Sequence, residues 1–445
     1  SRVIKELLVP RFKYKRFKGG IGVEEMDDGA GVRKKSMLMG KEILLGVTGG
    51  IAAYKAVELL REMTKRGANV HVIMTENAKR FVTPLTFQTL SGNPVLHEMF
   101  RLLEGSKIGH VAMSDIADLM VIAPATANII GKIANGIADD LLSTMVMAMD
   151  VPVLFAPSMN VKMWKSSFVQ YNVERLKAYG YHFVGPSEGD LACGSKGRGR
   201  LAEVPEILEK IEDIFTEKDF KGKRVLVTAG PTLEPLDPVR YLTNRSTGKM
   251  GFALAKMARR RGAEVLLITG PNYLTLPRND IKIITVSSAR EMYEAVMDNF
   301  EDYHVIIKAA AVADFRPKDI LAEKIKKADG TYLLELEQNP DILKELGKKK
   351  GERILVGFAA ETSSLMEHAE AKLREKNLDL IVANDVTQPG AGFGVDTNIV
   401  RIIDSRGKVR NLPLLTKDEV ADIVLDQVLK IIKKRKRTEA WPTNW

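Results

Sequence analysis

The segment EILLGVTGGIAAYKAVELLREMTKRGANVHVIM, residues 42–74, decides the fold of this chain. Its apolar run Glu42–Val47 precedes a pair of glycines, and apolar residues then recur at helical spacing as far as Arg66. Gly67 ends this helix, and residues 70–74 form a second apolar run. A strand, a helix and a strand in this order predict two parallel strands covered by the helix.

The same alternation continues along the chain and then restarts. RGAEVLLIT (261–269) repeats the order of residue types in RGANVHVIM (66–74), and the polar segment TEKDFKGK (216–223) separates the two halves. Further strands are predicted at 119–122, 153–155, 182–184, 224–228, 281–286, 305–308, 354–357, 380–382 and 400–403, and a closing helix at 412–432. We therefore predict an α/β protein of two doubly wound domains joined near residue 218, the first flavodoxin-like or Rossmann-like and the second Rossmann-like.

The net charge of +10 lies entirely in two terminal segments. Residues 1–36 carry ten Lys and Arg against five Asp and Glu, and residues 430–445 carry six against one. The body between them holds 51 of the 67 basic and 51 of the 57 acidic residues. Because the body is balanced, we expect solvated basic tails and no nucleic-acid partner.

Chain length and cysteine content indicate the number of domains and the cellular compartment. A chain of 445 residues exceeds one compact core, which supports two domains. No apolar run reaches the roughly 18 residues of a membrane span, and the N-terminal segment does not have the pattern of a secretion signal. Cys193 is the only cysteine, which fits a reducing compartment. We expect a cytoplasmic protein with no membrane partner.

Two strand-to-helix turns suit anionic ligands. GVTGGIAAYK (46–55) presents backbone N–H groups to a phosphate, but its glycine spacing is not G-x-G-x-x-G. This turn therefore suits a mononucleotide better than a dinucleotide. The alternative is a tight strand-to-helix turn that binds no ligand. NRSTGKMG (244–251) is not a Walker A loop, although its glycine and lysine also open a helix. Such ends of parallel strands are where open α/β sheets bind ligands.

Two single residues carry possible chemistry. His110 stands alone in a semi-apolar stretch with no local partner, which by itself favours a structural role. Cys193 lies in LACGSKGRGRLAE (191–203), where glycines and the cations Lys196, Arg198 and Arg200 cannot form a core. Nearby cations favour a thiolate, so this thiol is predicted to be reactive.

Longer segments carry a family resemblance. The first domain resembles the flavin-dependent phosphopantothenoylcysteine decarboxylases in GVTGGIAAYK, TENAKRFVTP, GHVAMSDIADLMVIAPATAN, PSMNVKMW and LACGSKGRGRL. The second resembles the phosphopantothenate–cysteine ligases in AGPTLEPLDPVRYLTNRSTGKMG, KAAAVADF, EKIKK, NPDI, GFAAET and NLDLIVANDV. Joined in this order they resemble the bifunctional proteins of coenzyme A biosynthesis. This implies a basic extension (1–39), an FMN-dependent decarboxylase domain (40–215), a ligase domain (220–432) and a basic tail (433–445).

For the second domain the resemblance implies ligation of 4′-phosphopantothenate with cysteine. CTP would activate the carboxylate as an acyl-cytidylate, with Mg²⁺ or another divalent cation whose ligands stay unassigned. Asn244 matches the family's residue at the acyl-cytidylate, and Arg240 accompanies it. The matched nucleotide-binding positions are Ala310, Asp314, Lys324, Asn339, Asp341, Phe358, Lys372 and Lys376.

For the first domain the resemblance implies decarboxylation of 4′-phosphopantothenoylcysteine with FMN, which serves as the electron sink that loss of CO2 requires. His110 matches the family's base, Asn160 its contact to the substrate carboxylate, and Cys193 its proton donor on a flap. The matched flavin contacts are Gly49, Gly50, Ile51, Thr75, Thr126, Ala127, Asn128 and Ser158. The family also implies a homo-oligomer, with trimers through the first domain and dimers through the second.

Two positions depart from the family pattern, and two other functions remain as alternatives. Lys308 stands where a small or apolar residue is expected before AAAVAD (309–314), and Ser195 where aspartate is usual. An NAD(P)-dependent oxidoreductase would also have two Rossmann-like domains, although the glycine spacing opposes it. A flavoprotein that binds without catalysing is the other alternative, which Cys193, His110 and Asn160 oppose.

Overall fold

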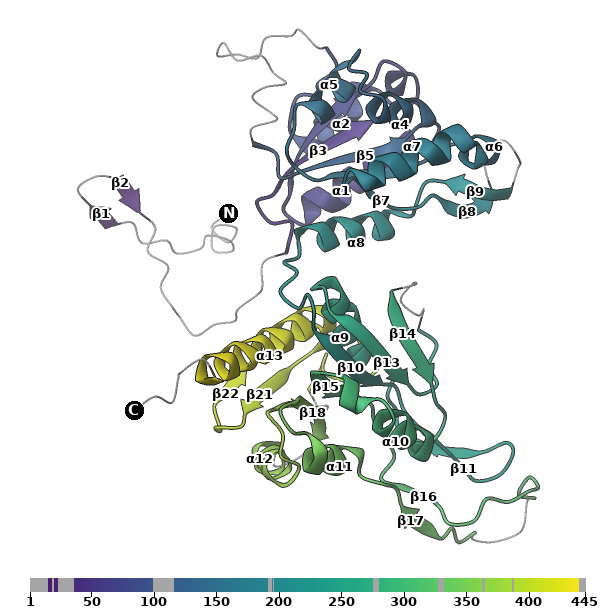
Figure 1. The fold of residues 1–445 in the computed structure, drawn as a ribbon, viewed down its shortest axis with the longest axis vertical. Helices are drawn as coiled ribbons and strands as arrows, with labels where there is room; N and C mark the ends of the chain where they lie inside the picture. The colour runs from purple at the N-terminus through teal and green to yellow at the C-terminus, as the bar shows by residue number, and fades with distance from the viewer. Residues whose placement is uncertain are drawn as a thin grey trace, which may run out of the picture.

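The chain folds into two α/β domains that follow one another along the sequence (Figure 1). The structure, a computed structural model, describes residues 15–17, 20–22, 36–98, 116–190, 194, 196–274, 280–326, 332–361, 365–385 and 388–439. A short hairpin of β1 (Lys15–Phe17) and β2 (Gly20–Gly22) precedes the first domain. The predicted fold class, two doubly wound domains, is confirmed.

The first domain is a parallel five-stranded sheet covered by helices on both faces. Its strand order is β4-β3-β5-β6-β7. The strands are β3 (Glu42–Val47), β4 (Asn69–Met74), β5 (Leu119–Ala125), β6 (Val153–Pro157) and β7 (His182–Phe183). The helices are α1 (Ala53–Lys65), η1 (Ala78–Arg80), α2 (Pro84–Ser91), α4 (Ala127–Ala134), α5 (Leu141–Met147), α6 (Val161–Lys165), α7 (Ser167–Ala178) and α8 (Val204–Phe215). A separate antiparallel hairpin joins β8 (Ser187–Asp190) to β9 (Lys196–Arg200).

Two apolar cores stabilise this sheet, one on each face. Helices α1, α2 and α8 bury their apolar sides on one face, and α4, α5 and α7 on the other. Leu38 is fully buried in the first of these cores. The folded body therefore begins before residue 40, inside the segment that was predicted to be the N-terminal extension.

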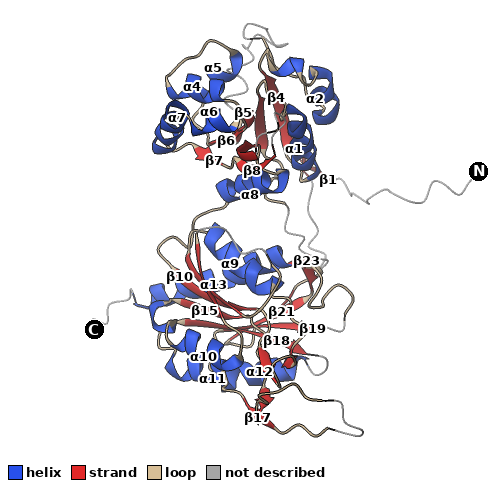
Figure 2. Cartoon of the chain, turned by 90° about the vertical axis from the view of Figure 1, so that its right-hand side faces the viewer, coloured by secondary structure: helices blue, strands red, loops and turns tan. Residues whose placement is uncertain are grey.

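The second domain is built on an eight-stranded sheet (Figure 2). Its order is β14-β13-β10-β15-β18-β19-β21-β22, and only β21 and β22 run antiparallel to their neighbours. The strands are β10 (Arg224–Ala229), β13 (Glu264–Thr269), β14 (Ile281–Thr285), β15 (Val305–Lys308), β18 (Ile354–Glu361), β19 (Leu380–Asp385), β21 (Val400–Asp404) and β22 (Val409–Asn411). Smaller pairs join β11 (Leu233–Pro235) to β12 (Tyr241–Thr243), β16 (Phe315–Pro317) to β17 (Leu336–Gln338), and β20 (Thr397–Asn398) to β23 (Leu415–Thr416).

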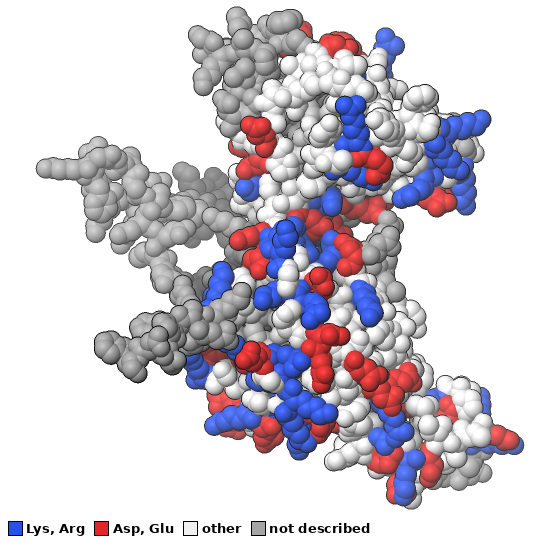
Figure 3. Space-filling view, in the orientation of Figure 1, with Lys and Arg blue, Asp and Glu red and all other residues white. Residues whose placement is uncertain are grey.

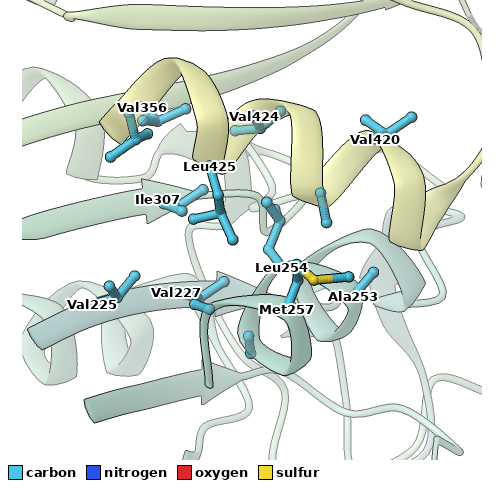
Figure 4. Packing of buried hydrophobic residues seen from close by; sticks show 14 of the residues in the cluster. Val225, Val227, Ala253, Leu254, Met257, Ile307, Val356, Val420, Val424 and Leu425 are labelled. Carbon is cyan, nitrogen blue, oxygen red and sulfur yellow. The ribbon is translucent and has the colours of Figure 1, made fainter. Parts of the chain in front are cut away.

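Helices cover both faces of this sheet as well. Helix α9 (Lys249–Arg260) and helix α13 (Lys417–Glu439) pack on one face, where Leu254 and Met257 lie against Val424 and Leu425 (Figure 4). The other face carries α10 (Ala289–Met297), η2 (Phe300–Asp302), α11 (Ile342–Lys349) and α12 (Leu365–Glu375).

The last helix differs from its predicted bounds. Helix α13 begins at Lys417, five residues later than predicted, because Leu415–Thr416 forms the short strand β23. It continues to Glu439, and Arg435 forms an ion pair with Asp379. The predicted basic tail (433–445) therefore includes residues of the folded helix.

Ion pairs join the two domains where α8 meets α9. The guanidinium of Arg260 donates from Nε to Asp213 (2.8 Å) and from Nη1 to Glu212 (3.0 Å), and its side chain is only 2% exposed. Arg259 also pairs with Asp213 at 3.1 Å. Figure 3 shows basic and acidic side chains intermixed over this junction. None of the helices in the described ranges is both long and apolar enough to cross a membrane.

Candidate active sites

A cavity of about 870 Å³ opens at the carboxyl ends of the strands of the first domain. This volume is within the range of known cofactor and small-molecule sites, which extends to about 1,000 Å³. Its lining includes Asn160 and all the predicted flavin contacts, namely Gly49, Gly50, Ile51, Thr75, Thr126, Ala127, Asn128 and Ser158. The fold thus brings together residues that are more than a hundred positions apart.

The turn after β3 is fixed by contacts to other parts of the domain, and it leads into a helix without a side-chain cap. Thr48 is buried, and its hydroxyl donates to the Pro124 carbonyl oxygen at 2.6 Å, which ties this turn to the end of β5. A side chain at Gly49 would come within 2.3 Å of the Cβ atom of Asn77, so only glycine fits. Helix α1 follows with no side-chain cap and no acidic residue in its first turn. No acidic side chain in the first turn therefore neutralises the positive end of the helix dipole, which suits the phosphate end of a flavin mononucleotide.

Apolar side chains complete the lining and suit an aromatic ring system. Ile51, Met74, Met159 and Met163 line the same cavity. Thioether side chains pack favourably against aromatic rings. The residues present therefore fit both the ring and the phosphate of such a cofactor.

Charged residues that the motifs did not indicate also line this cavity. The ammonium group of Lys132 lies 2.6 Å from Asp139 and 2.8 Å from Asp140. Burial opposes the charge of Lys132, but its hydrogen bonds to the two carboxylates raise its pKa overall. These residues stand on α4 and on the turn before α5, so only the folded chain reveals them as part of the site.

The β8–β9 hairpin lies against the segment that carries Asn160. The Met159 N–H donates to the carbonyl oxygen of Gly199 at 2.9 Å, and a Cβ atom at Gly199 would lie 2.3 Å from the Met159 carbonyl oxygen. Glycine is therefore required for this close approach. Alternation along β9 exposes Lys196, Arg198 and Arg200 while the glycines face inward. The cations of the cysteine loop thus stand on the strand face that is turned away from Met159.

Two predicted catalytic residues lie outside the described residues. These are His110 and Cys193, together with the substituted position Ser195. Asn160 is described: its side-chain oxygen accepts from the N–H of Lys162 at 2.8 Å and caps α6.

In the second domain two threonines fix the segment 310–313 that follows β15. Thr228 Oγ1 accepts from the Ala310 N–H at 3.2 Å, and Thr232 Oγ1 accepts from the Ala313 N–H at 3.1 Å. Asn244 donates from its side-chain amide to the Ala311 carbonyl oxygen at 2.9 Å. The residue matched to the acyl-cytidylate therefore touches the segment matched to the nucleotide.

Asp237 connects two further parts of this site. Its buried carboxylate accepts from the backbone N–H groups of Val239 (2.7 Å), Arg240 (2.7 Å) and Ile325 (3.1 Å), and from the Arg240 guanidinium (3.1 Å). Arg240 Nη1 also donates to the Ile325 carbonyl oxygen at 3.0 Å. Burial opposes ionisation, but the backbone hydrogen bonds from Ile325, Val239 and Arg240 lower the pKa of Asp237 overall. Asp237 thus holds Arg240 beside Lys324, which precedes Ile325.

We expect Asp237→Asn to lower ligase kcat/KM about 10- to 100-fold, because a displacement of about 1 Å in a positioned group costs on this order. The amide cannot accept from four donors at once, so the 237–240 turn and the 323–326 segment should separate. Steady-state kinetics of the ligase measure the effect, with the decarboxylase rate of the same protein as the internal reference. Asp404→Asn is the matched control, since Asp404 accepts two backbone N–H groups in the β21–β22 turn. Equal ligase kinetics in both variants would contradict the positioning role.

The remaining nucleotide positions gather around α11 and α12. Asp341 caps α11 by accepting from the Lys344 N–H at 3.0 Å, and it pairs with the ammonium group of Lys376 at 2.8 Å. Burial opposes ionisation of Asp341, but the bond from Lys376 lowers its pKa overall. Lys372 lies on α12, one turn before Lys376.

The other predicted positions have varied roles. The side chain of Asn339 holds the loop together, because it donates to the Ala313 carbonyl oxygen (2.9 Å) and accepts from Arg316 (3.0 Å). Phe358 is partly buried on β18, and Asp314 and Lys324 are exposed. No group of three or more His, Cys, Asp or Glu side chains in the described ranges is arranged to hold a metal ion.

The fold and these sites define a two-domain α/β enzyme with a ligand cavity in its first domain and a cluster of charged side chains in its second. Residues 32–216 match the flavoprotein family, and residues 220–432 match the DNA/pantothenate metabolism flavoprotein C-terminal domain. The chain belongs to the family of bifunctional coenzyme A biosynthesis proteins. It ligates phosphopantothenate with cysteine and decarboxylates phosphopantothenoylcysteine.

The relatives match nearly end to end. The coenzyme A biosynthesis bifunctional protein CoaBC of Bacillus subtilis is 51% identical over 401 residues, 89% of this chain and 99% of that protein. Its Escherichia coli K12 counterpart is 43% identical over 405 residues, 90% of this chain and 99% of that protein. A crystal structure of the C-terminal domain of CoaBC is 44% identical and covers 49% of this chain and 100% of that one, with a TM-score of 0.43. The predicted family and bifunctional activity are confirmed, and the oxidoreductase and non-catalytic alternatives are not supported.

Proposed function

We propose that the second domain uses CTP to activate 4′-phosphopantothenate and that the first domain uses FMN to decarboxylate the product. The observation that carries the ligase half is the contact of Asn244 with the Ala311 carbonyl oxygen at 2.9 Å. It joins the helix-opening segment 244–251 to the 310–313 segment, the two parts of the chain that would meet the acyl-cytidylate.

In the ligase step a carboxylate oxygen of 4′-phosphopantothenate attacks the α-phosphorus of CTP, and pyrophosphate leaves. The amine of cysteine then attacks the acyl carbon, and CMP leaves. Asn244 and Arg240 offer donors to the charge that develops on the phosphoryl oxygens, which is the type of stabilisation expected to matter most. Lys324, Lys372 and Lys376 suit the triphosphate, whose charge a divalent cation such as Mg²⁺ would share.

In the decarboxylase step FMN supplies a reversible electron sink, which allows the carboxylate to leave without forming an unstabilised carbanion. Asn160, at the start of α6, orients the substrate carboxylate. His110 accepts a proton from the substrate, and Cys193 returns one to the product carbon. The β8–β9 hairpin supports this arrangement, because its stem is bonded to Met159 beside Asn160.

The flavin assignment is tested with the double variant Thr126→Ala and Asn128→Ala. Both residues lie where β5 passes into α4, and both line the cavity. We expect a folded protein that purifies without flavin colour, loses decarboxylase activity and keeps its ligase rate within about twofold, because substitutions at a distant site are normally independent. Absorbance spectra and the two assays check this. A yellow variant with full decarboxylase activity would mean that the flavin binds elsewhere.

We also propose a homo-oligomer that works in the cytoplasm on CTP, cysteine and 4′-phosphopantothenate. Exposed apolar side chains support contacts between copies. Leu85, Phe168 and Tyr171 are exposed in the first domain, and Tyr241, Phe315 and Leu336 on the small hairpins of the second. Phe168 and Tyr171 stand on the same helix, α7, and Phe315 and Leu336 on the paired strands β16 and β17. Exposed apolar residues that lie close together are typical of interfaces. The single cysteine fits a reducing cytoplasm.

A further inference from the structure

Lys308 is a lysine at the centre of the second sheet. It ends β15, where its register partners are Thr228 on β10 and Gly357 on β18. Ile306 packs in the core beneath α10, α11 and α12, and residues two apart in a strand share a face. The side chain of Lys308 therefore rises on the same face, at the carboxyl end of the strand, where open α/β sheets bind their ligands.

Within the described ranges, the ammonium group of Lys308 forms no ion pair. It donates a hydrogen bond to the Ala310 carbonyl oxygen at 3.1 Å. The charged groups that face it are Asp314 after β15, Asp341 at the start of α11, and Lys372 and Lys376 on and just after α12. Asp341 already pairs with Lys376 at 2.8 Å. Across the described ranges, no carboxylate lies within 4.0 Å of Lys308 Nζ.

This environment destabilises the charged form of Lys308. Burial, and then repulsion from Lys376, lower the pKa of Lys308 to about 8, although Asp341 and Asp314 act in the opposite direction. A partly buried ammonium group without an anion is unfavourable, and an apolar side chain at this position would avoid the cost. A bound anionic ligand would stabilise the charged form of Lys308 at this position.

We propose that Lys308 contacts the phosphate groups of the bound nucleotide and becomes fully protonated as the nucleotide binds. The inference rests on the proposed CTP site. The neutral amine takes one proton from the solvent, and the resulting ammonium group pairs with a phosphate oxygen. No other bond forms or breaks in this step. The nucleotide thus supplies the counter-ion that the free protein lacks.

The coupling has a definite dependence on pH. With a pKa of about 8 in the free protein, the neutral form of Lys308 is much more populated at pH 8.5 than at pH 7. A phosphate contact restores a pKa at or above the ordinary value of about 10.4. Binding should therefore take up a measurable fraction of a proton per site at pH 8.5, where CTP is fully ionised, and much less at pH 7.

Isothermal titration calorimetry of the full-length protein with Mg²⁺ and CTP measures this uptake. Without 4′-phosphopantothenate no turnover occurs, and comparing two buffers of different ionisation enthalpy gives the number of protons bound. We expect the uptake to vanish in Lys308→Met, with CTP binding about 5- to 30-fold weaker. We expect Lys308→Arg to bind CTP within about threefold of the parent protein but without uptake, because arginine stays charged.

Lys350→Met is the matched control. Lys350 is a buried lysine that, like Lys308, donates to a backbone carbonyl, that of Asn377, but it precedes β18 at the opposite edge of the sheet. Its carboxylate partner Asp379 keeps Arg435, so no charge is left alone. This variant should keep the full uptake.

The possible results separate the two proposals. Unchanged CTP affinity and unchanged uptake in Lys308→Met would overturn the role of Lys308 while leaving the CTP site intact. Uptake that persists in Lys308→Arg would overturn it as well, and this variant suffices if Lys308→Met does not fold. Absence of CTP binding by the parent protein would overturn the proposed nucleotide and, with it, this inference.

Discussion

Cys193→Ser is expected to stop the decarboxylase after CO2 has left, while substrate still binds. Serine is close to cysteine in size, but its hydroxyl is a far weaker acid than a thiol with a pKa of about 8.5. The variant should therefore bind substrate, lose flavin colour once and release one equivalent of CO2 per site. The oxidised enethiol product should then stay bound, because no proton returns to it. Complete turnover should fall by about a thousandfold or more, at the upper end of what one proton-transfer group contributes.

Stopped-flow absorbance and mass spectrometry of the bound product measure this outcome. The ligase rate of the same polypeptide is the internal control, since Asn244 and the 310–313 segment belong to the other domain. Wild-type turnover in Cys193→Ser would assign the proton to another group and make the only cysteine a bystander.

Asn244→Asp is expected to abolish the ligase. The amide of Asn244 now donates to the Ala311 carbonyl oxygen at 2.9 Å, and a carboxylate would place an acceptor against that acceptor. It would also bring a negative charge toward the acyl-cytidylate phosphate. Removal of one preorganised donor costs about 100- to 1,000-fold in kcat, and the added repulsion increases the loss.

The measurement is CMP release from CTP, 4′-phosphopantothenate and cysteine. Decarboxylation of supplied 4′-phosphopantothenoylcysteine should stay at the parental rate. Asn299→Asp is the matched control, because Asn299 likewise donates to a backbone carbonyl, that of Ala295 at 2.9 Å, at the end of α10. A ligase that tolerates Asn244→Asp as well as Asn299→Asp would remove Asn244 from the proposed site.

The parallel core of both domains was predictable from sequence. The predicted apolar runs coincide closely with strands β3, β4, β10 and β15. Strands that are buried on both faces have nearly uninterrupted apolar sequences, which makes them easy to recognise. The hairpins β8–β9 and β16–β17 were not predicted. Their strands are short, and β9 reads KGRGR, a composition typical of a loop. It also packs closely against Met159 through Gly199, a contact that no local pattern encodes.

The site was predictable where a motif carries it and not where distant contacts do. The flavin-matched residues occur in short segments at strand ends, so their gathering at one edge follows from the parallel sheet. The roles of Thr48, Thr228 and Asp237 were missed. Their hydrogen-bond partners lie between 76 and 88 positions away, at Pro124, Ala310 and Ile325. Such contacts exist only after the strands have been placed.

The junction of α8 and α9 has an evolutionary consequence. Arg260 belongs to the ligase half, but the carboxylates that neutralise it, Glu212 and Asp213, belong to the flavoprotein half. A sign change on one side alone would leave a buried charge without its partner, at a cost of about 3–5 kcal/mol. A charge-reversing substitution in one half therefore needs a compensating one in the other half to keep the junction neutral. Separate expression of the two halves would likewise expose Arg260 and its two carboxylates without their partners.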